Sequence, residues 1–179
     1  YIFLTKNDLD NYMNSDLFKN FGAFPHITEL DVKIYRVLRG SEDTVDMATW
    51  PSGNVDPTRE DIESAVIFYP RFNVDFGTGL EGTPSNPEEF EGALIEPMSF
   101  AKMWHNSNVP GLQSKFFTLD EANKIGTGVY IFNNQEYLDD YLKSELLSNF
   151  KSFPHITALK VDIYNIIGGT ELTVAANPW

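Results

Sequence analysis

Phe153-Pro-His-Ile-Thr-Ala-Leu-Lys-Val-Asp-Ile-Tyr164 is the stretch that decides the fold. From Ala158 to Tyr164, apolar and polar residues alternate with a period of two, which predicts a half-buried antiparallel strand. Residues 24–28 repeat the Phe-Pro-His-Ile-Thr run, and an Ile-Tyr pair follows it at the same distance in both places. The stretch therefore indicates the kind of sheet and also an internal repeat.

The repeat is long and has no gap. Residues 1–50 align with residues 130–179 at a constant offset of 129, and 24 of the 50 aligned positions are identical. This period is too long for a solenoid repeat and is typical of tandem domains. We therefore expect the C-terminal half of one domain at 1–50, a linker at 51–62, and a complete domain at 63–179.

The complete domain is predicted to run strand, helix, strand, strand, helix, strand. This order is that of the ferredoxin-like split βαβ arrangement, so we expect an α+β fold with an antiparallel sheet and helices on one face. Pro70 should lie at the end of the first strand, at a sheet edge or at a bulge. Asn133 or Asn134 is expected to cap the second helix. The predicted strands cover 65–76, 112–118, 128–132 and 158–164.

The partial copy lacks the strand that should lie in its middle. In this topology the first strand separates the third from the fourth, and residues 1–50 supply only the third strand, the second helix and the fourth strand. A partner protein, a second chain or a fragment of the same precursor should complete it, because unpaired buried backbone groups are costly. The chain begins inside a strand and without Met, so we expect a processed product or a fragment.

Composition argues against several classes of function. A net charge of −13 argues against nucleic acid and against an anionic membrane surface. No run approaches the roughly 20 apolar residues of a membrane span, so no membrane insertion is expected. The chain has no Cys, and its three His residues are scattered, so no metal site is expected. The compartment is left open.

Residues 110–132 hold a set of motifs that point to one family. The motifs are Pro-Gly, an aromatic-flanked Lys, an acidic residue before an Asn, and a Gly-Val-Tyr-Ile-Phe run, at Pro110, Gly111, Lys115, Glu121, Asn123, Gly128, Tyr130 and Phe132. With them the chain resembles the YdhR-like monooxygenases, a branch of the dimeric α/β barrel superfamily. The resemblance covers the complete domain and, through the repeat, residues 1–50.

This resemblance implies a small-molecule cavity between sheet and helices, used for oxygenation without a cofactor. It also implies sheets that pair face to face, which would cover the apolar side chains of Leu30, Val32 and Ile34. Two departures stand out. The family has Trp residues around the Lys where this chain has Ser114 and Phe117, and its usual unit is a single domain.

The expected ligand cavity has an aromatic lining, although an ordinary aromatic core would use most of the same residues. Candidates for catalytic or polar contacts are His105, Asn123 and Tyr130. The repeat-equivalent His26 and His155 are more typical of structural loop residues. The expected lining consists of Phe68, Phe72, Trp104, Phe116, Phe117 and Tyr130.

Two functions of different classes remain. The main hypothesis is a structural or interaction subunit of a larger assembly, favoured by the tandem repeat, the altered cavity residues and the lack of a catalytic constellation. The alternative is a cofactor-independent monooxygenase, or a binder, of a small aromatic or polyketide-like molecule.

Overall fold

The computed structural model describes two compact units of the chain. They span Tyr1–Ile34 and Tyr35–Trp179, and each is treated by itself. The described residues are 3, 5–38, 64–76, 84–90 and 108–166.

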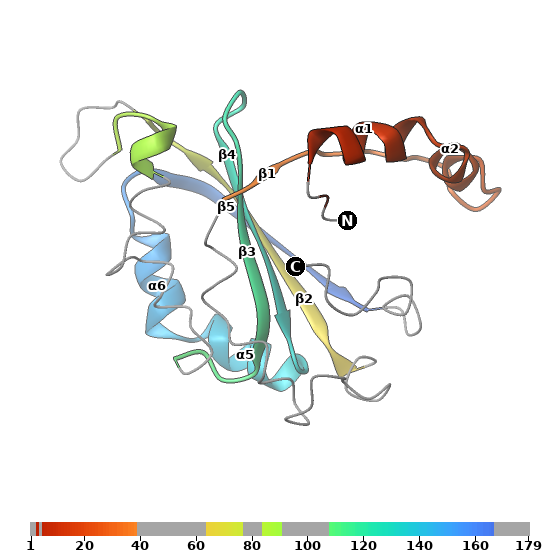
Figure 1. Ribbon diagram of the computed structural model, residues 1–179. Coiled ribbons are helices and arrows are strands. Elements are labelled where there is room, and N and C mark those ends of the chain that lie inside the picture. The colour runs from red at the N-terminus through yellow and green to blue at the C-terminus, as the bar shows by residue number, and fades with distance from the viewer. Residues whose placement is uncertain (1–2, 4, 39–63, 77–83, 91–107, 167–179) are drawn as a thin grey trace. The chain divides into compact units, whose positions relative to one another are not determined.

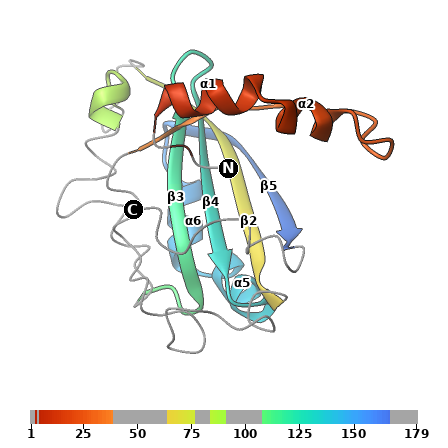
Figure 2. The same cartoon turned by 45° about the vertical axis from the view of Figure 1, so that its right-hand side comes forward.

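The second unit is built on a five-stranded antiparallel sheet. Its strands are β1 Arg36–Val37, β2 Val66–Val74, β3 Leu112–Asp120, β4 Ile125–Phe132 and β5 Ile156–Asn165, and their order is β1-β3-β4-β2-β5. Figure 2 shows β3, β4, β2 and β5 side by side in this order. Because β2 lies between β4 and β5, the predicted ferredoxin-like α+β fold is confirmed.

Pro70 lies inside β2 rather than at its end. β2 is an inner strand, and Pro70 is paired with Val161 of β5. The register of β2 against β5 shifts between Arg71 and Asn73, so the proline precedes a bulge. A residue without an N–H is tolerated best where a ladder is already irregular.

The fourth strand of the partial copy, which the repeat predicts at residues 29–37, forms only at Arg36–Val37. Arg36 and Val37 pair with Leu119 and Thr118 on the outer edge of β3. The Arg36 side chain also donates to the Glu121 carboxylate at 2.6 Å. A strand needs a hydrogen-bonded neighbour, and the edge of β3 provides one for these two residues. The second compact unit therefore begins at Tyr35, upstream of the boundary expected at residue 63.

Two helices cover one face of the sheet. They are α5 Gln135–Leu142 and α6 Glu145–Lys151, where the sequence predicted one continuous helix. Asn134 caps α5 as predicted, and Ser144 caps α6 by accepting from the backbone N–H of Leu147 at 3.2 Å. Figure 1 shows both helices on the same side of the strands. Their buried side chains are Leu138, Tyr141, Leu147 and Phe150.

The first unit contains a helix pair that resembles α5 and α6. α1 Lys6–Asn14 and α2 Asp16–Gly22 are separated at Ser15, which aligns with Ser144 in the repeat. Ser15 caps α2 in the way that Ser144 caps α6. The break between helices therefore occurs at the same aligned position in both segments. Residues 1 and 2, which belong to the third strand expected for the partial copy, lie outside the described residues.

Candidate ligand-binding site

An aromatic cluster lies between the sheet and α5. Because side chains alternate along a strand, β2, β3 and β4 each direct an aromatic ring to the helix-covered face. Phe68 contacts Tyr130 with ring centroids 5.2 Å apart and Tyr141 of α5 at 5.4 Å. Phe117 contacts Tyr130 at 6.1 Å. These four residues define what we call the aromatic cluster.

Lys115 lies against the aromatic cluster. It pairs across the strands with Tyr130, which places both side chains on the helix-covered face. Its relative exposure is 1%, and its Nζ lies 4.6 Å from the centroid of the Phe117 ring. Burial lowers the pKa of Lys115 from 10.5 to about 6, because a charged ammonium loses its hydration there. At neutral pH the side chain is therefore largely an uncharged amine.

Gln113 is another buried polar side chain of β3. The pairing of β3 with β4 shifts between Leu112 and Ser114, so Gln113 is the extra residue of a β-bulge. Its relative exposure is 2%, and its Oε1 accepts no hydrogen bond within the described part of the chain. Buried polar atoms normally have a partner, so this carbonyl oxygen is an unused acceptor.

The hydroxyl of Tyr130 is also enclosed. Burial and the hydrogen-bonded Tyr141 hold the pKa of Tyr130 well above its usual value of 10.0. The phenol therefore stays neutral and serves as a donor or acceptor. The backbone of Gly128 packs directly against the Tyr130 ring, since a Cβ added to Gly128 would lie 2.3 Å from that ring. Only glycine leaves room for the ring at this point.

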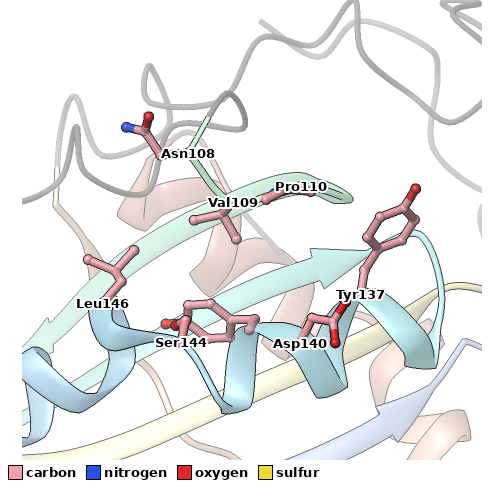
Figure 3. Close-up of a pocket in the computed structure, with 8 residues that line it drawn as sticks. Asn108, Val109, Pro110, Tyr137, Asp140, Ser144 and Leu146 are labelled. Carbon is pink, nitrogen blue, oxygen red and sulfur yellow. The ribbon is translucent and has the colours of Figure 1, made fainter.

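A pocket opens next to the aromatic cluster. It has a volume of about 160 Å³, and Tyr141 is one of its walls. Figure 3 shows the loop before β3 on one side and the α5–α6 region on the other. This volume is below the roughly 300 Å³ at which ligand pockets begin. A drug-sized ligand would therefore have to displace side chains. Tyr141 lies between the pocket and the aromatic cluster, because it belongs to both. The lining residues are Asn108, Val109, Pro110, Tyr137, Asp140, Tyr141, Ser144 and Leu146.

On the opposite face of the sheet, several polar side chains form hydrogen bonds with one another. The hydroxyls of Thr118 and Thr127 are 2.5 Å apart. Tyr69 is hydrogen bonded to Tyr35 and Thr127, and burial raises its pKa to about 12. Because these groups satisfy one another, they are better explained as structural contacts than as a ligand site.

The structure places the expected aromatic lining on two faces. Phe68, Phe72, Phe117 and Tyr130 are buried on the helix-covered face, where Phe72 contacts Phe150 with centroids 5.1 Å apart. Phe116 is half-buried and pairs with Val129, so it lies on the opposite face. Adjacent residues of one strand cannot both face the same cavity. Trp104 lies outside the described residues.

The polar candidates are spread over the chain. Tyr130 lies in the aromatic cluster. Asn123 is in the exposed turn between β3 and β4, where its side chain and backbone bond to Asp120 and lower the pKa of that carboxyl. His105 lies outside the described residues. Of the polar candidates within the described ranges, Tyr130 lies in the aromatic cluster and Asn123 does not.

The two Phe-Pro-His histidines differ in their surroundings. His26 is exposed. The ring of His155 lies between Phe153 and Phe90, at centroid distances of 5.4 and 6.1 Å. Burial lowers the pKa of His155, and its Nδ1 has no hydrogen-bond partner among the described residues. His155 therefore belongs to a small aromatic contact away from Lys115.

Lys115 and Gln113 were not among the predicted site residues. Lys115 is two residues before Phe117 and four before Leu119, so the alternation of side chains along the strand could have predicted that all three lie on the same, buried face. The burial of Gln113 depends on a bulge, which the sequence does not reveal.

Within the described ranges, no group of three or more His, Cys, Asp or Glu side chains could hold a metal ion. In the same ranges, no helix is long and apolar enough to cross a membrane.

Comparison with known proteins supports the fold. The sequence matches no protein-family model and no curated protein. A solved structure from Fusobacterium nucleatum, described as a "putative monooxygenase", is similar with a TM-score of 0.50 and 13% identity, covering 89% of this chain and 67% of that one. The likeness agrees with the ferredoxin-like α+β fold seen in the sheet order. At this identity the likeness concerns the fold alone.

Two other structures are more distant. One, from Lactobacillus acidophilus, has a TM-score of 0.39 at 13% identity and covers 56% of this chain. This chain spans only 44% of that protein's length. The other, SnoaB from Streptomyces nogalater, is described as a cofactor-independent oxygenase and has a TM-score of 0.42 at 13% identity, covering 60% of this chain and 97% of that one. Among these comparisons, the description of the Fusobacterium structure is closer to the alternative hypothesis than to the structural-subunit hypothesis.

Proposed function

We propose that this chain binds a small aromatic or polyketide-like molecule between its sheet and α5, and oxygenates it without a cofactor. The observation that carries the proposal is the buried amine of Lys115 beside the rings of Phe117 and Tyr130. Ligand sites typically combine an apolar, aromatic lining with a few polar groups that orient the ligand. The aromatic cluster has both features.

The chemistry follows from what the site offers. In a cofactor-independent monooxygenation, one atom of dioxygen enters the substrate and the other leaves as water, with the electrons taken from the substrate's own bonds. The protein then has to bind the substrate, keep water away and hold its polar groups in place. Rings packed at 5–6 Å supply an enclosed, apolar environment for this. The name of the Fusobacterium protein agrees with this chemistry but is that protein's own.

The test combines ligand binding with oxygen uptake. We expect the intrinsic fluorescence of the purified protein to be quenched when an oxidisable tricyclic hydroxyaromatic compound is added. The protein should consume dioxygen only when that compound is present, and a metal chelator should not change the rate. Tyr130→Phe removes one enclosed hydroxyl and should lower turnover at least tenfold. Tyr164→Phe removes an exposed hydroxyl from β5 and should leave turnover unchanged. Absence of binding for a broad set of polycyclic compounds would contradict the proposal.

A further inference from the structure

The small pocket beside α5 combines two tyrosine rings with a carboxylate. It has a volume of about 160 Å³, and Tyr137, Asp140 and Tyr141 lie along it. Asp140 and Tyr141 follow Tyr137 by three and four residues in α5, so the three share one side of the helix. Figure 3 shows Val109 and Pro110 on the loop across from α5. The walls are therefore mainly apolar and aromatic, with one negative charge.

Both walls of this pocket are fixed by the fold. The backbone carbonyl of Gly111 accepts a hydrogen bond from the Asn133 N–H at 2.9 Å, which ties the loop before β3 to the residue after β4. Gly111 has a φ of 75°, and a Cβ added to it would lie 2.2 Å from Cγ of Tyr137. The Tyr137 side chain therefore packs directly on the backbone of this loop. A site that is already ordered loses little freedom when a ligand binds.

The carboxylate of Asp140 sets the sign of charge that the pocket accepts. Asp140 is exposed, and it forms no ion pair with the described residues. The neighbouring Asp139, by contrast, accepts a hydrogen bond from the Gln135 side chain at 2.7 Å. The net charge of −13 also attracts small cations and repels small anions. A ligand of this pocket should therefore be positively charged.

The walls decide which kind of cation suits the pocket. Aromatic rings attract cations through the negative face of their π system, and quaternary ammonium groups are recognised in this way. The methyl groups of such a cation can pack on apolar side chains such as Val109 and Leu146. A primary ammonium is strongly hydrated and needs acceptors for three N–H groups, so it loses more on leaving water. A trimethylammonium group is also compact enough for a pocket of this volume.

We propose that this pocket binds a small molecule through a trimethylammonium group. Tyr137 and Tyr141 contact the methyl groups, and the carboxylate of Asp140 compensates the positive charge. This binding does not require the oxygenation proposed above, since it uses a different space and a different ligand.

The experiment compares choline with 3,3-dimethylbutan-1-ol on the full chain. The alcohol has the shape of choline, with a carbon in place of the charged nitrogen. In titrations followed by NMR, we expect choline to bind at least fivefold more tightly than the alcohol at low salt. Ethanolamine, which lacks the methyl groups, should bind at least threefold more weakly than choline. The proposal is overturned if choline does not bind, or if either other compound binds as tightly as choline does.

Variants separate the ring from the charge. Tyr137→Leu should weaken choline binding at least threefold, whereas Tyr137→Phe keeps the ring and should bind choline as the wild type does. Asp140→Asn should weaken choline binding at least twofold without changing the binding of the alcohol. Asp139→Asn, at the neighbouring exposed position, is the matched control and should leave choline binding unchanged. Equal effects of the two Asp→Asn substitutions would mean that general charge attraction binds choline, and would overturn the proposal.

The outcomes also identify the source of the group and separate the two proposals. Sedimentation of the chain with phosphatidylcholine vesicles, reversed by free choline, would support the site with a lipid headgroup as its ligand, and binding of free choline alone would support it with a soluble cation. Failure of choline to bind leaves the proposed function unaffected, and failure of polycyclic compounds to bind leaves this site unaffected. The wild-type comparison of choline with the alcohol decides this inference even if a variant fails to fold.

Discussion

At the scale of single residues, Lys115 links the site to stability. Its pKa falls from 10.5 unfolded to about 6 folded, so between these pH values the unfolded chain binds more protons. As far as Lys115 determines it, the free energy of unfolding is highest above pH 10.5 and decreases as the pH falls toward 6. The decrease is at most about 1.4 kcal/mol per pH unit.

We therefore expect Lys115→Met to remove this dependence. The difference in unfolding free energy between variant and wild type should shift in favour of the variant by up to about 2.7 kcal/mol between pH 9 and pH 7. Urea denaturation at pH 7, 8 and 9 measures it, with Lys143→Met as control. A difference that stays constant over this range would show that the amine is not buried in solution.

At the scale of elements, the break between the two helices over the sheet lies at a serine. Ser144 is the N-cap of α6, and Ser15 occupies the equivalent position as the N-cap of α2. The break allows the chain to turn so that Tyr141 of α5 and Phe150 of α6 both reach the core. A continuous helix could not cover the curved, twisted sheet in the same way.

Ser144→Ala should therefore lower the free energy of unfolding by about 0.5–2 kcal/mol, since α6 loses its N-cap. Ser148→Ala changes the same residue type at an exposed position inside α6 and is expected to change stability by less than about 0.5 kcal/mol. Chemical denaturation of both variants decides this. Equal effects of the two substitutions would mean that the cap contributes nothing.

At the scale of the whole molecule, apolar side chains of the first unit lack cover. Val32 and Ile34 are 41% and 57% exposed in the single chain. Burying each such side chain contributes about 1.5–3 kcal/mol. We propose that the partial copy at 1–50 is completed by a strand–helix–strand segment from a second chain or fragment, and that its sheet then packs against the sheet of the complete domain at 63–179.

Native mass spectrometry of the purified protein tests this proposal. We expect a particle heavier than the 20.3 kDa of one chain. Limited proteolysis of the same sample should spare residues 1–50 only within that heavier particle. A folded monomer of 20.3 kDa that resists proteolysis across residues 1–50 would contradict the proposal.

Much of the fold was predictable because it depends on local patterns. The alternation at Ala158–Tyr164 located β5, the aromatic and β-branched run after Ala65 located β2, and Asn134 marked the start of α5. The order of these elements then led to the ferredoxin-like sheet. Part of the aromatic cluster could also be predicted, because Phe68, Phe117 and Tyr130 lie at inward-facing positions of three predicted strands.

By itself, the sequence determined β2, β3, β5, the start of α5 and the order in which the strands of the complete domain pair, because period, caps and turns act over a few neighbours. Only the tertiary structure decided that Arg36 and Val37 join the edge of β3, that Gln113 is displaced into a bulge, and that Lys115 is enclosed by aromatic rings. Each of these depends on contacts between segments far apart in the chain, and burial, which lowers the pKa of Lys115, exists only after those segments have packed.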